Sequence, residues 1–255
     1  MTHCVYQTLL TYRKTGRKAL AVLIDPDKVE DMAACRRLVH MSIENQVDFF
    51  LIGGSLITRD NFGDVVQLVK QESNLPVVLF PGSNLHIEPS ADAILFLSLI
   101  SGRNPELLIG QHVVAAPVLK RSGMEVLSTG YILIDSGGPT AVSYMSNTVP
   151  IPRDKPSVVA CTAMAGEMLG LKLIYLEAGS GAEQPIDSKT IRLVRKSIEV
   201  PLIVGGGIND RYKAQKALEA GADMLVVGNA LERNPQLLAE LADLMDGYRN
   251  VRSAP

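Results

Sequence analysis

A single carboxylate ends one of the apolar runs of this sequence. Glu177 closes the run LKLIYLE, which begins at Leu171, and Gly179, Ser180 and Gly181 follow almost at once. A buried strand that opens into a glycine-rich turn brings backbone N–H groups close to a ligand, because glycine has no side chain to obstruct the approach. We therefore expect the Glu177 carboxylate to face whatever molecule is bound there.

Glycines also follow two later apolar runs, in VGGGI and VGNA. The backbone N–H groups of such turns, together with the positive ends of the helices that follow, suit a phosphate group. The residues predicted to converge there, with Ser180 adding a hydroxyl donor, are Gly179, Gly181, Gly206, Gly207, Gly228 and Asn229. The alternative is that these glycines only form tight turns between strands and helices.

A second polar group follows the first two apolar runs, which end in DPDK and GGS. Asp25 offers a carboxylate and Ser55 a hydroxyl, a sparse set that suits Mg²⁺, because this ion keeps several waters and is completed by substrate phosphates. Lys28 could contact a diphosphate, and Asp27 is expected to cap a helix. The alternative for Asp25 is an ordinary turn, since Asp-Pro commonly starts one.

Nucleophilic catalysis is not indicated by the other reactive side chains. The histidines, none of which falls at the end of an apolar run, are His3, His40, His86 and His112. They form no Ser-His-Asp or Cys-His arrangement. The cysteines, odd in number and without CxxC spacing, are Cys4, Cys35 and Cys161. Reduced thiols of this kind are typical of a cytoplasmic protein.

Eight continuous apolar runs organise the chain, and most are followed by a segment of helical period. They begin at Ala19, Asp48, Pro76, Asp92, Gly130, Leu171, Pro201 and Asp223. Runs of this kind are typical of parallel strands buried on both faces. We therefore predict an α/β fold, a (β/α)8 TIM barrel, with residues 1–255 forming a single domain. Helices are predicted after the last two runs. One is capped by Asn209 or Asp210 and ended by Gly221, and the other has Asn234 as its cap, Pro235 as its first residue and Gly247 just past its end.

The connection between the third and fourth runs is too short for a helix. Only Ser83 to Asp92, which include Pro89, join these two strands, and a parallel crossover usually needs at least about a dozen residues. The barrel is therefore expected to lack its third outer helix and to leave an apolar flank, open to a long greasy ligand or covered by a neighbouring segment or second subunit.

Composition limits the classes of partner. The chain has 255 residues, 47% of them hydrophobic and 20% charged, with a net charge of -2, so nucleic-acid binding is not expected. No apolar run reaches the roughly 18 residues of a membrane span, and we expect a cytoplasmic protein. The last residues, 249–255, are expected to form a frayed tail.

The motifs DPDK, IGGS, FPGS, FLSLISGRNP, YILID, YLEAGSGA, VGGGI and VGNA, in this order, resemble the geranylgeranylglyceryl phosphate synthase family, which includes heptaprenylglyceryl phosphate synthases. The resemblance runs from about Ala21 to about Leu231. It implies a modified TIM barrel lacking the third outer helix. It also implies transfer of a polyprenyl group, expected to be geranylgeranyl, from its diphosphate to the C3 hydroxyl of sn-glycerol 1-phosphate, which forms an ether-lipid precursor.

The resemblance also assigns roles to residues. It implies that Asp25 and Ser55 ligate Mg²⁺. The residues it implies for sn-glycerol 1-phosphate are Tyr175, Leu176, Glu177, Ala178, Gly179, Ser180, Gly181, Gly206, Gly207, Gly228 and Asn229. Glu177 is then the catalytic residue, placed to accept the proton of the attacking hydroxyl. The chain has no Trp, an aromatic that relatives often use to limit prenyl length, and Leu107 and Leu108 are expected to set that limit instead.

Two alternatives are kept. A phosphosugar isomerase or epimerase on a similar barrel would need a second acid or base opposite Glu177, for which Asp135 is the candidate. A non-catalytic binder of prenyl phosphates would gain nothing from a carboxylate next to an anion. The missing helix further favours a homo-oligomer, either a dimer or a hexamer.

Overall fold

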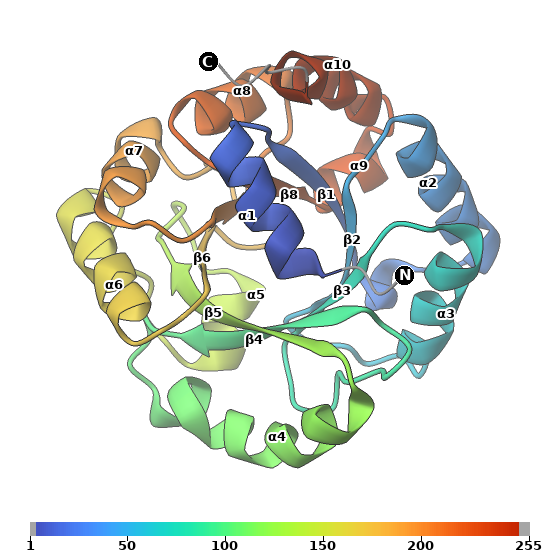
Figure 1. Cartoon of the computed structure of the whole chain (residues 1–255), viewed down its shortest axis with the longest axis horizontal. Coiled ribbons are helices and arrows are strands. Elements are labelled where there is room, and N and C mark those ends of the chain that lie inside the picture. The colour runs from blue at the N-terminus through green and yellow to red at the C-terminus, as the bar shows by residue number, and fades with distance from the viewer. Residues whose placement is uncertain (1–3, 250–255) are drawn as a thin grey trace.

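Eight parallel strands form a closed barrel in the computed structural model, which describes residues 4–249. Each strand pairs with the next one along the chain, and β8 pairs with β1 to close the sheet (Figure 1). The strands are β1 (Ala19–Ile24), β2 (Phe49–Gly54), β3 (Val77–Pro81), β4 (Ala93–Leu99), β5 (Glu125–Leu133), β6 (Leu173–Glu177), β7 (Leu202–Gly205) and β8 (Met224–Val227). The predicted barrel is confirmed, although β5 starts before the predicted Gly130 because its polar first residues pair with β4.

Helices surround the barrel and connect its strands. They are α1 (Val5–Thr15), α2 (Met32–Glu44), α3 (Phe62–Glu72), α4 (Gln111–Ser122), α5 (Ala141–Ser146), α6 (Pro156–Met168), α7 (Ser188–Ser197), α8 (Arg211–Glu219), α9 (Asn229–Arg233) and α10 (Leu237–Arg249). A single 3-10 turn, η1 (Pro26–Lys28), follows β1, and a π-helical turn, η2 (Glu106–Gly110), precedes α4. Within residues 4–249, none of the helices is long and apolar enough to cross a membrane. Residues 250–255 of the predicted tail lie outside the described residues.

Alternate side chains of each strand point into the barrel or outward to the helices. On β6, Leu173 and Tyr175 belong to the inner apolar cluster, whereas Ile174 and Leu176 belong to the outer one. Both layers remove apolar surface from water, which drives the closure of the sheet. The same alternation places the carboxyl group of Glu177 on the inner side of the barrel, within an otherwise apolar layer.

Helix α1, which the sequence analysis did not predict, closes the end of the barrel where the strands begin. Its Val5 and Leu9 pack into the inner cluster. Glu125, the first residue of β5, accepts hydrogen bonds from the backbone N–H groups of Val5 at 2.6 Å and Tyr6 at 3.1 Å. Figure 1 shows α1 lying across the centre of the ring of helices. A ligand can therefore enter the barrel only from the opposite end.

The third outer helix is absent, as predicted. Residues 83–92 join β3 to β4 as a loop, and Figure 1 shows the ring of helices interrupted between α3 and α4. His86 of this loop is buried against Phe62 of α3, with ring centroids 5.6 Å apart, and its Nδ1 accepts the backbone N–H of Gly82 at 3.2 Å. Leu85, in contrast, is 85% exposed. The loop therefore covers only part of the flank.

The two helices predicted after the last strands are present, but α10 begins at Leu237 rather than at the predicted Pro235, so the predicted cap Asn234 is wrong, and its end differs as well. The cap of α8 is Asp210 rather than Asn209, because its carboxylate accepts a backbone N–H of the first turn. Helix α10 continues through Gly247 to Arg249, so the predicted end at Gly247 is wrong. Tyr248 packs against the outer cluster, and this tertiary contact keeps the last turn helical.

Three aspartates link the strands at the end closed by α1. Each stands just before its strand and accepts the backbone N–H of the preceding strand. The pairs are Asp48 with Leu20 at 2.9 Å, Asp92 with Val77 at 2.8 Å and Asp223 with Leu202 at 2.9 Å. Each carboxylate also pairs with a base at 2.7 Å: Arg17, Lys70 and Arg195 respectively. Backbone groups that the barrel would otherwise bury without partners are thereby satisfied.

Replacement of Asp223 should destabilise the barrel strongly. Its side chain is 5% exposed and lies 2.7 Å from Arg195 and 3.3 Å from Lys18, so Asp223→Asn leaves both cations without their partner. We expect the free energy of unfolding, measured by urea denaturation, to fall by about 3 to 5 kcal/mol. The matched change Asp243→Asn, at an aspartate whose side chain is 79% exposed, should leave the midpoint nearly unchanged, and equal midpoints for the two variants would contradict this role.

Candidate active site

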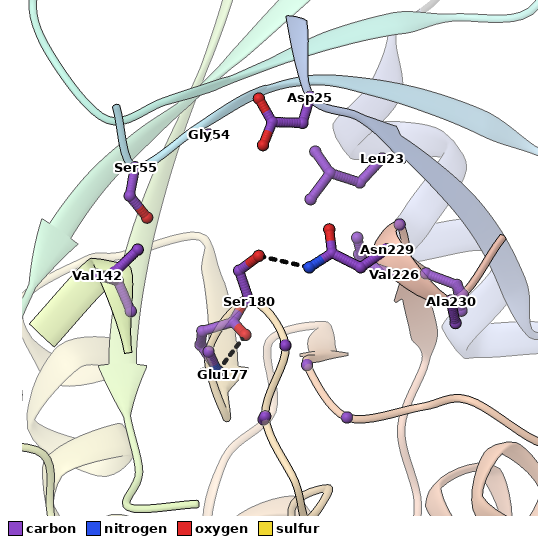
Figure 2. A pocket seen from close by; sticks show the side chains of 18 of the residues that line it. Leu23, Asp25, Gly54, Ser55, Val142, Glu177, Ser180, Val226, Asn229 and Ala230 are labelled. Carbon is purple, nitrogen blue, oxygen red and sulfur yellow. Dashed lines mark hydrogen bonds between the residues drawn. The ribbon is translucent and has the colours of Figure 1, made fainter. Parts of the chain in front are cut away.

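A cavity of about 380 Å³ lies at the carboxyl ends of the strands, opposite α1. The predicted site residues that line it are Asp25, Ser55, Tyr175, Glu177, Gly179, Ser180, Gly181, Gly206, Gly207, Gly228 and Asn229. Figure 2 shows Asp25 and Ser55 along one side of the cavity, with Ser180 and Glu177 across from them and Asn229 between. The structure thus brings the predicted phosphate half and the predicted magnesium half into one cavity.

Two residues predicted to bind substrate do not line this cavity. Leu176 and Ala178 alternate with Tyr175 and Glu177, and their side chains pack in the outer cluster. The backbone N–H of Ala178 donates to the carbonyl of Gly205 at 3.1 Å, so the sheet already uses it. These two residues hold the end of β6 in place rather than presenting a side chain to a ligand.

Glu177 is a buried carboxylate at the inner end of β6. It is 6% exposed, and its Oε1 accepts the backbone N–H of Gly179 at 2.6 Å. Burial raises the pKa of Glu177 from 4.5 to about 7, although this N–H and the hydroxyls of Tyr175 and Tyr131 lower it. A carboxyl with a pKa near neutrality can both release and take up a proton, which is what a general base requires.

Three aromatic rings form the floor beneath Glu177. Phe80 stacks on Tyr175 with centroids 5.4 Å apart, and Tyr131 lies 5.3 Å from Tyr175. Burial, and after it the charge of Glu177, raises the pKa of both tyrosines well above the ordinary value, so they remain neutral. The buried Tyr175 hydroxyl lies close enough to Glu177 to lower the pKa of that carboxyl.

The glycines after β7 are required by what lies beneath them. Gly206 has a φ of 82°, and a Cβ there would lie 2.4 Å from Oε1 of Glu177 and 2.8 Å from the nitrogen of Gly179. A Cβ on Gly205 would lie 2.3 Å from the hydroxyl oxygen of Tyr175. The glycine run therefore does more than form a tight turn, since it makes room for the buried carboxylate and tyrosine.

Asp25 occupies the other side of the cavity, at the end of β1. It caps η1, because its Oδ1 accepts the backbone N–H of Asp27 at 3.1 Å. Burial raises the pKa of Asp25, and Lys28, 3.7 Å from Oδ2, partly offsets this rise. A Cβ on Gly54 would lie 3.2 Å from Oδ1, so glycine keeps the space beside the carboxylate open. Ser55, the next residue, lines the same side.

Asp27 has a different role from the predicted helix cap. It lies inside η1, and its carboxylate accepts the backbone N–H groups of Thr58 at 2.7 Å and Arg59 at 3.0 Å. The cap of α2 is Asp31. Asp27 therefore joins the loops that follow β1 and β2, and it keeps Asp25 and Ser55 facing the same space.

Two of the helices expected to point at the phosphate half begin next to the cavity. Asn229, the first residue of α9, and Asn209, just before α8, both line it. One first-turn N–H of α7 and one of α8 are taken by the carboxylates of Asp187 and Asp210. Asn229 donates from Nδ2 to Ser180 Oγ at 2.7 Å and accepts from Lys28 Nζ through Oδ1.

The sequence analysis missed several residues that line the cavity. Phe80 and Tyr131 lie within quoted motifs but received no role, and Arg233 was not named. Counting back in steps of two from each strand end would have placed Phe80 and Tyr131 inside the barrel. Nothing in the sequence marks Arg233, the last residue of α9, because its position depends on how that short helix packs.

The cavity combines a proton acceptor with two polar halves, one rich in backbone N–H groups and one carrying a carboxylate and a hydroxyl. Asp135, which an isomerase would need opposite Glu177, is exposed, accepts the N–H of Gly137 and does not line the cavity. Residues 4–249 contain no cluster of three or more histidine, cysteine or acidic side chains suited to a metal. The arrangement suits deprotonation of a hydroxyl group next to a bound anion.

The model of the PcrB family matches residues 13–245. The chain belongs to the PcrB family. The geranylgeranylglyceryl phosphate synthase of Spirosoma linguale is 58% identical over 237 residues, which cover 93% of this chain and 95% of that one. The protein of the same name from Chitinophaga pinensis is 51% identical over 243 residues, which cover 95% and 96%. These names confirm the family and the prenyltransferase class that the motifs predicted.

A solved structure of this PcrB-family fold carries a ligand. It is the crystal structure of (S)-3-O-geranylgeranylglyceryl phosphate synthase from Thermoplasma acidophilum in complex with its substrate sn-glycerol-1-phosphate. Its TM-score to this chain is 0.90 at 31% identity, and the alignment covers 97% of this chain and 99% of that one. The modified TIM barrel predicted from the sequence is confirmed by this similarity.

The stability of the ligand-free protein should reveal the raised pKa of Glu177. The folded state holds the proton up to about pH 7, whereas the unfolded chain releases it near 4.5, so stability is lost as pH rises through this window. Urea unfolding at pH 5 and pH 8 should show a loss, relative to Glu177→Gln, of up to about 3 kcal/mol. Parallel pH profiles for the two proteins would show that Glu177 is not perturbed.

Gly206→Ala should disturb the site, whereas Gly247→Ala should not. A methyl group at Gly206 meets Glu177 and Gly179 and needs a left-handed backbone, so we expect a loss of about 1 to 3 kcal/mol in unfolding free energy and weaker binding of inorganic phosphate. A methyl group at Gly247 in α10 meets nothing within 4 Å and should stabilise by up to about 1 kcal/mol. Urea denaturation and calorimetric titration with phosphate are carried out on both variants. Equal changes in unfolding free energy and phosphate affinity for Gly206→Ala and Gly247→Ala would refute the steric role of Gly206.

Proposed function

We propose that this PcrB-family protein transfers a polyprenyl group from its diphosphate to the C3 hydroxyl of sn-glycerol 1-phosphate. The product is an ether-lipid precursor, and diphosphate is released. The single observation that carries the proposal is Glu177, a buried carboxylate with a pKa near 7, at the end of β6 beside the glycine turns. The substrate named for the Thermoplasma acidophilum relative supports the same acceptor.

The acceptor is proposed to lie over the ends of β6, β7 and β8. Backbone N–H groups of the glycine turns and the hydroxyl of Ser180 would bind its phosphate, and Arg233 lies at the edge of the same cavity. Tyr175 lies under Glu177 at the floor of the cavity, where its fully buried ring packs against Phe80 and Tyr131. The glycerol hydroxyls would then lie next to the carboxylate.

Glu177 is proposed as the general base. A bond forms between the C3 oxygen of the acceptor and the first carbon of the prenyl chain, while the bond from that carbon to the diphosphate breaks. The hydroxyl proton passes to the Glu177 carboxylate, whose other protein contacts hold it in place. The apolar and aromatic floor formed by Phe80, Tyr131 and Tyr175 keeps water from the allylic carbon, which carries positive charge during transfer.

The residues on the side of Asp25 fit Mg²⁺. One donor is the Asp25 carboxylate, of which only Oδ1 accepts a backbone N–H. The other is the Ser55 hydroxyl, which has no hydrogen-bond partner within residues 4–249 and lines the cavity. Such a set suits an ion that keeps waters and is completed by phosphate oxygens. When bound, Mg²⁺ would neutralise the charge of the leaving diphosphate.

The prenyl chain is proposed to follow the flank left by the missing helix. Leu107, in η2, packs against the inner cluster, whereas the carbonyl of Leu108 accepts the hydroxyl of Ser98 at 3.4 Å. Leu107 is therefore the better candidate for limiting chain length, and the geranylgeranyl donor stays a prediction. The homo-oligomer also stays a prediction, and the exposed Ile109 and Val113 beside the flank agree with it.

The alternatives are less well supported. An isomerase or epimerase needs an acid or base opposite Glu177, and the candidate Asp135 is exposed outside the cavity. A non-catalytic binder has no use for a carboxylate whose pKa is brought to about 7 beside an anion site. Either alternative would also mean that this protein has a function different from the activity named for relatives that are 58% and 51% identical to it.

Incubation with labelled sn-glycerol 1-phosphate, Mg²⁺ and a series of polyprenyl diphosphates should yield an ether product. EDTA should abolish it, sn-glycerol 3-phosphate should replace the acceptor poorly, and Glu177→Gln should lower kcat by about 10² to 10⁴, the range of general-base catalysis. The donor series shows the preferred chain length. Absence of product with every donor would reject the prenyltransferase proposal.

A further inference from the structure

Lys28 lies between the two halves of the cavity. Its Nζ is 3.7 Å from Oδ2 of Asp25 and 3.6 Å from Oε2 of Glu232, and it donates a hydrogen bond to Oδ1 of Asn229. Asn229 in turn donates from Nδ2 to Ser180 Oγ at 2.7 Å. One line of polar contacts therefore crosses the mouth of the barrel, from Glu232 through Lys28 and Asn229 to the proposed acceptor side.

The single positive charge of Lys28 lies close to two carboxylates, those of Asp25 and Glu232, and it cannot neutralise both. Burial raises the pKa of both Asp25 and Glu232, and the charge of Lys28 lowers both. Two partly buried carboxylates thus compete for a single cation. A diphosphate beside Asp25 would add further negative charge at the same place. Among residues 4–249, Lys28 is the cation that contacts Asp25, so it is placed to offset this charge.

The surroundings leave Lys28 room to change partners. Its side chain is 36% exposed. It lines a second cavity of about 540 Å³, which lies between η1, α2 and α9 and shares Leu23, Asp25 and Gly228 with the first. The free volume of this second cavity beside the Lys28 side chain means that a move of the ammonium from Asn229 toward Asp25 requires no repacking of the core.

We propose that Lys28 binds the diphosphate of the donor. Glu232 is a positioning residue that holds the Lys28 ammonium away from the diphosphate. Asn229 couples the contact between Lys28 and the diphosphate to the acceptor site. The proposal rests on the proposed function. The Asn229 carboxamide is planar, so its nitrogen and oxygen move together. When a phosphate beside Ser180 draws Nδ2, Oδ1 turns away from Lys28 and releases the ammonium. Acceptor binding therefore strengthens donor binding.

Calorimetric titration with pyrophosphate and Mg²⁺ tests this without turnover. Lys28→Met should weaken pyrophosphate binding by at least about tenfold and leave sn-glycerol 1-phosphate affinity within about twofold. Glu232→Gln should tighten pyrophosphate binding by about threefold, because it frees Lys28 and removes a repelling charge. Saturating sn-glycerol 1-phosphate should tighten pyrophosphate binding severalfold in the unaltered protein and not in Lys28→Met.

Matched controls separate the local contact from a general change of charge. Lys216 and Glu219 form an exposed ion pair of 3.2 Å on α8, so Lys216→Met and Glu219→Gln repeat the two charge changes away from the cavity. Both should bind pyrophosphate like the unaltered protein. Far-ultraviolet circular dichroism and thermal unfolding verify that every variant is folded before titration.

The outcomes distinguish this inference from the proposed function. Pyrophosphate affinity that is unchanged in Lys28→Met, or changed equally by Lys216→Met, overturns the role of Lys28. Unchanged affinity in Glu232→Gln overturns the positioning role, and equal tightening by sn-glycerol 1-phosphate with and without Lys28 overturns the coupling. If sn-glycerol 1-phosphate does not bind the unaltered protein at all, the proposed function fails, while the pyrophosphate titrations still report on Lys28.

Discussion

The burial of one carboxylate inside an apolar barrel is the constraint on which the site depends. Glu177 would be neutral at physiological pH if burial acted alone, since a charged group loses its hydration there. The N–H of Gly179 and the hydroxyls of Tyr131 and Tyr175 return part of that stabilisation and bring the pKa to about 7. Oε1 of Glu177 and the nitrogen of Gly179 leave no space for a side chain at Gly206, so the carboxylate also fixes the sequence of the next strand end.

The two ends of the barrel treat polar groups in opposite ways. At the end closed by α1, Asp48, Asp92 and Asp223 each have a backbone donor and a cation, so their hydrogen-bonding capacity is used within the protein. At the other end, the glycine turns and Ser55 line the cavity, where the N–H of Gly179 is used by Glu177 and the hydroxyl of Ser55 has no hydrogen-bond partner among the described residues. One end therefore contributes stability, and the other retains the unsatisfied polar groups that a ligand needs.

The missing helix affects the ring of helices but not the closure of the sheet. The β3 and β4 strands still pair through Val78 with Ala93 and Leu79 with Ile94, so the barrel is complete without a helix at that position. His86 and the loop around it cover part of the exposed strands. The position of this loop follows from a connection too short to contain a crossover helix.

The sequence by itself determined the barrel, the absent helix and the list of strand-end residues, because continuous apolar runs and glycine turns are local signals of buried parallel strands. It also determined that Glu177 and Asp25 would lie at the same end, since all strands of such a barrel run in one direction. Tertiary structure alone decided that Asp27 joins two loops and that Lys28 connects the halves of the cavity. These contacts join residues far apart in the chain, so only the closed and twisted sheet sets them.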